Sequence, residues 1–232
     1  MYGPLYAPPY DDADVTLIVD RQNLPTSNIN EIINKVANIR KYCISYPILR
    51  MLNIVASGKG GNEKPFIMRT VPDEPIFILS RVDRVSIIFH LRFDEPTDRA
   101  IARIVVQELT EANRVVNNAP VCSWSEREPP LELKGIPNIP IPNQDPFSIG
   151  YLTFSIFPNS CKTDNQKEII AGQFSLFRNY LLYHIKAGKA YLHARMRNRC
   201  DSLQRVLNRA IPEDPFAEKE KKLASGKTFV RK

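Results

Sequence analysis

Residues 163–210 read TDNQKEIIAGQFSLFRNYLLYHIKAGKAYLHARMRNRCDSLQRVLNRA, and the next proline along the chain is Pro212. Thr163 and Gln166 have the spacing of a capping box, which marks the start of a helix. The apolar positions recur about every 3.7 residues, close to the helical period. They are Ile170, Phe174, Phe177, Leu181, Ile185, Leu192, Met196, Cys200, Leu203 and Leu207. The sequence therefore predicts a long C-terminal helix over residues 161–211.

The length of this helix predicts that it contacts another protein chain. At a rise of about 1.5 Å per residue the helix spans roughly 70 Å. A compact body made by a chain of 232 residues has a diameter of only about 45 Å. Part of the apolar side should therefore meet another chain, unless the helix bends at Gly188.

Positive charge is concentrated in the same region. The formal net charge is +7, and residues 161–232 hold 16 lysines and arginines against 7 acids. Residues 178–209 hold one acid, Asp201, among the cations Arg178, Lys186, Lys189, Arg195, Arg197, Arg199, Arg205 and Arg209. Such a charge asymmetry suits an acidic protein surface, nucleic acid or anionic lipid.

The preceding residues have the alternation of a sheet. We predict strands over residues 66–71, 76–80, 84–93, 121–125 and 149–157, which are short runs separated by turn residues, and the third alternates cleanly. In the third strand Val85, Ile87 and Phe89 share a packed face, whereas Ser86 and His90 lie on a face expected to be partly wet. The fold class predicted is α+β, with a mostly antiparallel sheet of four to five strands flanked by helices and followed by the long C-terminal helix.

Two helices are predicted before and within the sheet. The first begins near Ile29, is broken or kinked by Pro47 and resumes over residues 48–55. The second starts at Pro96 and runs to about Val116. Its predicted buried side is Ile101, Ile104, Val105, Leu109 and Ala112. The proline-rich residues 126–147 have no hydrophobic periodicity and are predicted to form an ordered or semi-ordered connection between strands.

Residue patterns typical of catalysis, metals or nucleotides are weak. Gly226-Lys227-Thr228 resembles the end of a phosphate-binding loop, but Lys221 stands where that motif needs glycine. The three histidines have no helical i, i+4 pair, and the four cysteines form no CxxC pair. We therefore predict no enzyme activity, no cofactor and no metal. No stretch approaches 18 consecutive apolar residues, so no membrane insertion is expected.

Several blocks resemble a known family, in the same order. They are EREPPLELK at 126–134, IGYLTFSIFP at 149–158, FRNYLLYHIKAGKAYLHARMR at 177–197, VLNRA at 206–210 and SGKTF at 225–229. They are similar to subunit 2, the 34 kDa subunit, of the actin-related protein 2/3 complex. The resemblance covers nearly the whole chain.

The resemblance implies an architecture and partners. Residues 1–27 correspond to the remnant of a first α/β domain, residues 28–160 to a second, residues 161–211 to the long helix and residues 212–232 to a basic tail. The long helix is expected to pair with subunit 4, with the other subunits of the complex around them. The assembly starts a branch from the side of an existing actin filament, which implies a cytoplasmic, cytoskeletal protein.

Two sets of contact residues follow. For subunit 4 we predict the apolar side chains Phe174, Phe177, Leu181, Ile185, Leu192 and Met196, although the first two suit the chain's own sheet as well. For the acidic side of actin we predict Lys189, Arg195, Arg197, Arg199, Arg205 and Arg209. The alternative is a basic nucleic-acid-binding protein, which the arginine cluster favours although no motif that reads DNA or RNA is recognised.

Overall fold

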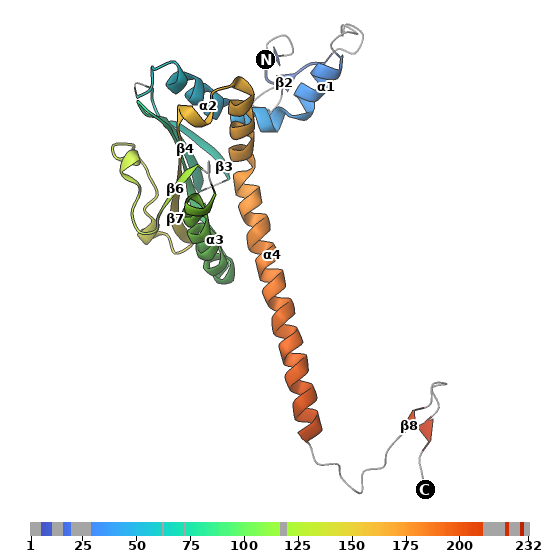
Figure 1. Cartoon of the computed structure of the whole chain (residues 1–232). Coiled ribbons are helices and arrows are strands. Elements are labelled where there is room, and N and C mark those ends of the chain that lie inside the picture. The colour runs from blue at the N-terminus through green and yellow to red at the C-terminus, as the bar shows by residue number, and fades with distance from the viewer. Residues whose placement is uncertain are drawn as a thin grey trace. The chain divides into compact units, whose positions relative to one another are not determined.

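The fold combines an antiparallel sheet with helices, and the predicted α+β class is confirmed (Figure 1). The structure is a computed structural model. It describes residues 6–10, 16–19, 29–61, 63–71, 73–116, 120–210, 221–222 and 228–229. The chain divides into two units, residues 1–182 and residues 183–232. Most of residues 1–27 and 212–232, predicted as a domain remnant and a basic tail, lie outside the described residues.

The main sheet has five strands in the order β3-β4-β5-β7-β6, and each neighbouring pair is antiparallel. Its strands are β3 (Phe66–Val71), β4 (Glu74–Ser80), β5 (Val85–Arg92), β6 (Val121–Ser125) and β7 (Ser148–Ile156). All five predicted strands are therefore confirmed, with ends that differ by one or two residues. Short pairs also form between β1 (Tyr6–Ala7) and β2 (Thr16–Leu17) and between β8 (Lys221–Lys222) and β9 (Thr228–Phe229).

Helices cover one face of the sheet. The buried side of α2 (Ile39–Ala56) is formed by Ile48, Met51, Leu52 and Val55. From the first part of α4 (Asp164–Ala210), Phe177 packs against Phe89 with ring centroids 4.8 Å apart. Phe174 and Phe177 both contact Phe154, each at 5.0 Å. The aromatic contacts anchor the start of α4 on β5 and β7.

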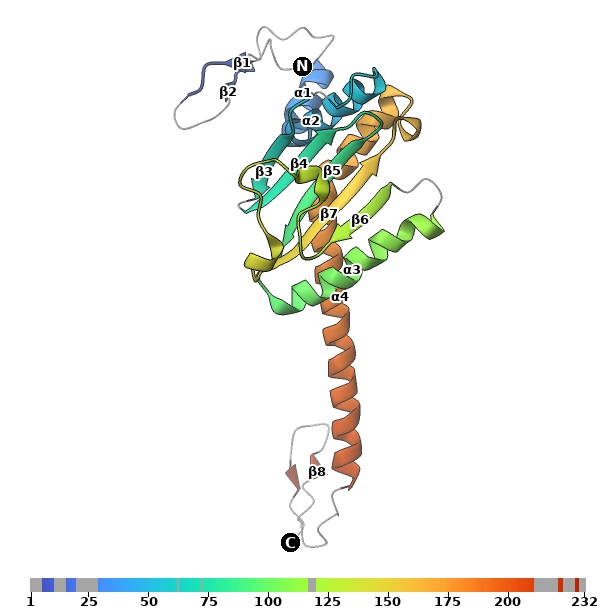
Figure 2. The ribbon, with the colours of Figure 1, turned by 90° about the vertical axis from the view of Figure 1, so that its left-hand side faces the viewer.

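Residues 126–147, called the strap below, cover the other face. Figure 2 shows this yellow-green segment in front of β4 and β5, with the first part of α4 behind the sheet. The strap contains the short helices η3 (Leu131–Leu133) and η4 (Pro142–Gln144). Leu133 is fully buried in a cluster with Phe77, Leu79, Ile88 and Tyr151, and the Tyr151 hydroxyl donates to the Pro140 carbonyl at 2.6 Å.

The strap overturns the prediction that one face of β5 is partly wet. Ser86, Ile88 and His90 are all buried. The strap that buries this face of β5 has no hydrophobic periodicity. The polar residues that alternate in β5 therefore gave no sign that the face is buried. Ile136 and Ile139 of the strap add apolar surface over the same cluster.

The first predicted helix is divided at a different place. α1 (Ile29–Ala37) ends before Asn38, and α2 then runs through Pro47 without a break. The prediction of a break at Pro47 is wrong, because the four apolar side chains that follow it are buried and offset the hydrogen bond that proline removes. Asn38 instead turns its side chain to the Asn34 carbonyl at 2.8 Å.

The helix α3 (Pro96–Val115) has the predicted bounds, and one residue of its predicted buried side is exposed. Ala102 and Val106 are fully buried, whereas Ile104 is 62% exposed. The other four predicted residues, Ile101, Val105, Leu109 and Ala112, are half-buried. The prediction is therefore wrong only at Ile104.

The long helix begins and continues as predicted. The Gln166 amide donates to Thr163 Oγ1 at 3.3 Å, and the Thr163 amide donates to Gln166 Oε1 at 3.2 Å, which is the predicted capping box. α4 then continues for 47 residues and passes through Gly188 without interruption. At about 1.5 Å per residue this is a helix of about 70 Å.

A buried ion pair holds α4 at the start of β4. Arg178 donates through Nε and Nη2 to the two carboxylate oxygens of Glu74, at 2.5 and 2.6 Å. The guanidinium also lies 5.0 Å from the centre of the Phe93 ring. Glu74 is only 7% exposed, so this pair is shielded from solvent.

Candidate interaction surface

The six side chains predicted to meet subunit 4 fall into two groups. Phe174, Leu181 and Ile185 are buried in the chain itself, and Phe177 is half-buried against Phe89 and Phe154. The other two, Leu192 and Met196, are 48% and 64% exposed. Of the predicted set, only Leu192 and Met196 are thus open to a partner.

The last part of α4 has an apolar side that the described residues leave uncovered. Every residue from 190 to 210 is exposed. At about 100° per residue, five large apolar side chains fall within an arc of about 100°. They are Leu192, Met196, Leu203, Val206 and Leu207, and they are called the exposed stripe below. Sequence periodicity had included Leu203 and Leu207 in the helix but had not selected them as contact residues.

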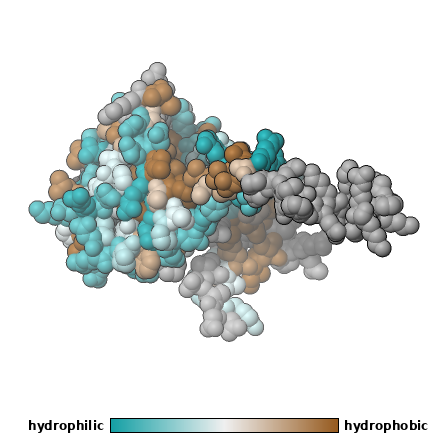
Figure 3. Space-filling model, turned by 90° about the horizontal axis from the view of Figure 1, so that it is seen from below, coloured by the Kyte–Doolittle hydropathy of each residue, from teal (hydrophilic) through white to brown (hydrophobic). Residues whose placement is uncertain are grey.

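Figure 3 views the molecule from below and shows hydrophobic, brown side chains exposed among hydrophilic, teal ones. Single exposed apolar residues are ordinary on protein surfaces, whereas a continuous row on one helix indicates an interaction site. Each side chain of the exposed stripe is at least 48% exposed. The row has the spacing of a helix that packs against another helix.

The predicted actin-contacting cations surround this stripe instead of forming one separate face. By helix geometry, Arg195 and Arg209 lie on one flank, whereas Arg197 and Arg205 lie toward the side of the helix that faces away from the stripe. Lys189, which is half-buried and has a partner in the structure, borders the stripe. The sixth, Arg199, falls within the stripe. Arg195 packs over the Tyr191 ring at 5.6 Å.

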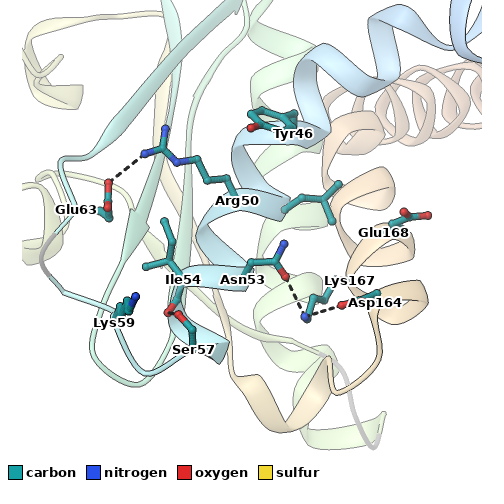
Figure 4. A pocket seen from close by; sticks show the side chains of 11 residues that line it. Tyr46, Arg50, Asn53, Ile54, Ser57, Lys59, Glu63, Asp164, Lys167 and Glu168 are labelled. Carbon is teal, nitrogen blue, oxygen red and sulfur yellow. Dashed lines mark hydrogen bonds and ion pairs between the residues drawn. The ribbon is translucent and has the colours of Figure 1, made fainter. Parts of the chain in front are cut away.

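A pocket of about 760 Å³ lies elsewhere, between α2 and the first turns of α4 (Figure 4). Four of its charged side chains form two pairs, since Arg50 contacts Glu63 at 3.4 Å and Lys167 contacts Asp164 at 2.8 Å. The hydrogen bond from Lys167 lowers the pKa of Asp164. Lys167 also donates to Asn53 at 2.9 Å. The pocket offers paired charges instead of a reactive group aimed into it.

Ser148 and His90 have the spacing of a nucleophile and a base but a structural setting. Ser148 Oγ lies 3.0 Å from His90 Nε2, and His90 Nδ1 lies 3.0 Å from the Asp73 carbonyl. The Ser148 oxygen also accepts the Gly150 amide at 3.1 Å. Both side chains are buried. The neutral imidazole satisfies this network by donating through Nδ1 and accepting the serine hydroxyl at Nε2.

Acid should weaken the fold through His90. Burial lowers the pKa of His90 below its ordinary 6.5, although the backbone bond to Asp73 and the carboxylates of Asp145 and Glu74 oppose this. The unfolded chain therefore binds the proton first, and stability falls as pH drops below about 6.5. We expect the unfolding free energy of the wild type to fall relative to His90→Gln by up to about 1.4 kcal/mol per pH unit. Urea unfolding from pH 7 to pH 5 measures this, and parallel curves would contradict it.

The described residues offer little for other chemistry. Burial raises the pKa of the Cys122 thiol to about 12 and also raises that of Cys161, which keeps both thiols protonated. No group of three or more metal-binding side chains occurs among the described residues. In the same part of the chain, no helix is both long and apolar enough to cross a membrane.

Comparison with known proteins identifies the family of this chain. A family model described as "Arp2/3 complex, 34 kD subunit p34-Arc" matches residues 1–214. The actin-related protein 2/3 complex subunit 2 of Dictyostelium discoideum is 32% identical over 231 residues, which are 99% of this chain and 75% of the relative. That of Schizosaccharomyces pombe is 39% identical over 161 residues, 68% of this chain and 48% of the relative. The chain thus belongs to the family of the 34 kD subunit of the Arp2/3 complex.

Proposed function

We propose that the chain is a scaffold subunit of the Arp2/3 complex and that α4 pairs with subunit 4. Family membership supports the place in the complex. The exposed stripe carries the proposal for the pairing, because it offers five large apolar side chains on one side of a helix. In this role the chain holds other subunits in place and catalyses no reaction of its own.

The exposed stripe can supply enough energy for a stable pair. Burying one large apolar side chain contributes about 1.5–3 kcal/mol. Five such side chains give a gross gain of the order of 10 kcal/mol, before the cost of association and side-chain ordering. Matching apolar residues on a partner helix would add to this gain. A micromolar or tighter complex is therefore within reach of this surface.

Copurification tests the pairing. The full chain, co-expressed with its cognate subunit 4, is expected to elute from size exclusion as a stoichiometric pair. Elution of the two chains apart would refute the proposal. Binding of duplex DNA by the chain, with a steep loss as salt rises, would instead support the alternative of a nucleic-acid-binding protein.

We propose further that cations of α4 contact the side of an existing actin filament during branch formation. Of the six predicted cations, Arg199 lies within the stripe that the partner helix would cover. The remaining candidates are Lys189, Arg195, Arg197, Arg205 and Arg209, whose charges would face an acidic filament surface. These charges lie beside the stripe or on the side of the helix away from it, so a partner helix on the stripe leaves them accessible.

Reversing two of these charges should weaken filament binding. For the complex that carries Arg195→Glu and Arg205→Glu, we expect about five- to tenfold weaker co-sedimentation with actin filaments at about 0.05 M salt. The effect should shrink at about 0.2 M salt because screening weakens exposed charges. Gln204→Glu, which adds one acid on the other flank, is the control. Unchanged co-sedimentation of the double variant would remove the filament assignment.

A further inference from the structure

Arg199 lies inside the exposed stripe. At about 100° per residue it falls between Leu192 and Val206 on the helix surface and close to the line joining Met196 to Leu203. It is exposed, and no described side chain pairs with it. A helix that covers the stripe would therefore cover this guanidinium as well. Arg197, two residues earlier, points away from the stripe.

A covered arginine needs a partner. Taking a guanidinium out of water without a counter-charge costs several kcal/mol, whereas a paired and hydrogen-bonded one is tolerated. Arginine cannot lose its proton to escape this cost. We propose that Arg199 determines which helix can pair with α4. It requires an aspartate or glutamate on the partner helix, at the position that faces Arg199. This rests on the proposed pairing of α4 with subunit 4.

A second copy of this chain, paired through residues 183–210, lacks that carboxylate. Residues 183–210 contain one acid, Asp201, and helix geometry places it on the side opposite the stripe. The same residues hold seven lysines and arginines. Two copies would bring like charges together and leave both Arg199 side chains unpaired. The stripe therefore selects a different, acidic helix.

The test compares charge reversal at two neighbouring positions. Arg199→Glu and Arg197→Glu remove the same charge from the same helix, but only the first lies in the stripe. We expect binding of the full chain to cognate subunit 4 to weaken about 100-fold for Arg199→Glu and less than about threefold for Arg197→Glu. Titration calorimetry measures both. Arg199→Leu leaves the partner carboxylate covered without its counter-charge, so it should also lose at least about tenfold in affinity.

A charge exchange identifies the opposing group. Each aspartate or glutamate on the helix of subunit 4 is changed to lysine in turn and tested against Arg199→Glu. One exchange should restore most of the lost affinity. If none restores it, the requirement for a carboxylate is refuted.

The outcomes separate the two proposals. If the wild-type chain binds subunit 4 and the variants Arg199→Glu and Arg197→Glu lose equal affinity, the role of Arg199 is refuted. The proposed pairing with subunit 4 would remain intact. No binding by the wild type would refute both. Because Arg199 is exposed in the chain alone, all three variants should keep the wild-type melting temperature, which excludes misfolding as a cause of lost binding.

Discussion

Replacement of Met196 and Leu203 by aspartate is expected to abolish the pairing with subunit 4, with a loss of at least about 1,000-fold in affinity. These side chains are 64% and 60% exposed in the chain alone, so a partner helix supplies their burial. Two carboxylates would then be buried in an apolar seam without counter-charges. Size exclusion of the co-expressed chains and titration calorimetry measure the loss.

The matched control places the same charges elsewhere on the same turns. Asn198→Asp with Gln204→Asp adds two acids to exposed positions outside the stripe. This variant should bind within about threefold of wild type. Both double variants should retain the melting temperature of the parent chain. A loss of equal size in both variants would contradict the assignment of the stripe as the contact surface.

Loss of Arg178 is expected to produce the largest change in stability. Arg178→Met leaves Glu74 buried without its counter-charge, and breaking a buried pair in this way costs about 3–5 kcal/mol. The change also removes the contact of the guanidinium with Phe93. Urea unfolding followed by circular dichroism gives the change in unfolding free energy.

Two further variants isolate the ion pair. Arg103→Met removes an exposed partner of Glu126, at 3.1 Å, and should cost less than about 1 kcal/mol. Glu74→Met combined with Arg178→Met removes both buried charges and should be less destabilising than Arg178→Met alone. Equal losses of unfolding free energy for Arg178→Met and Arg103→Met would show that the buried pair contributes no more to stability than an exposed pair.

The sequence predicted elements whose signals are local. Short runs bounded by turn residues located the strands of the main sheet, and Thr163 with Gln166 located the start of α4. The cover over Ser86 and His90 was missed because the strap is aperiodic and packs through a few residues such as Leu133. Pro47 was misjudged because its local cost is offset by burial of the residues that follow it.

The candidate surface was only partly predictable for a related reason. Periodicity treats Phe174 and Met196 alike, although the first is buried against Phe154 and the second is exposed. Only three-dimensional packing distinguishes a core residue from a contact residue on one continuous stripe. Arg199 was assigned by its charge, whereas its angle around the helix places it among apolar side chains.

The ring of cations around the stripe also affects how quickly a pair forms. Long-range attraction toward an acidic partner accelerates the encounter and fades as ions screen it, whereas the apolar contacts made afterwards govern how long the pair lasts. Mutual repulsion between the same cations slows aggregation of newly made chains through their uncovered leucines and methionine. The same cations thus slow aggregation of the unassembled subunit and accelerate its binding to an acidic partner.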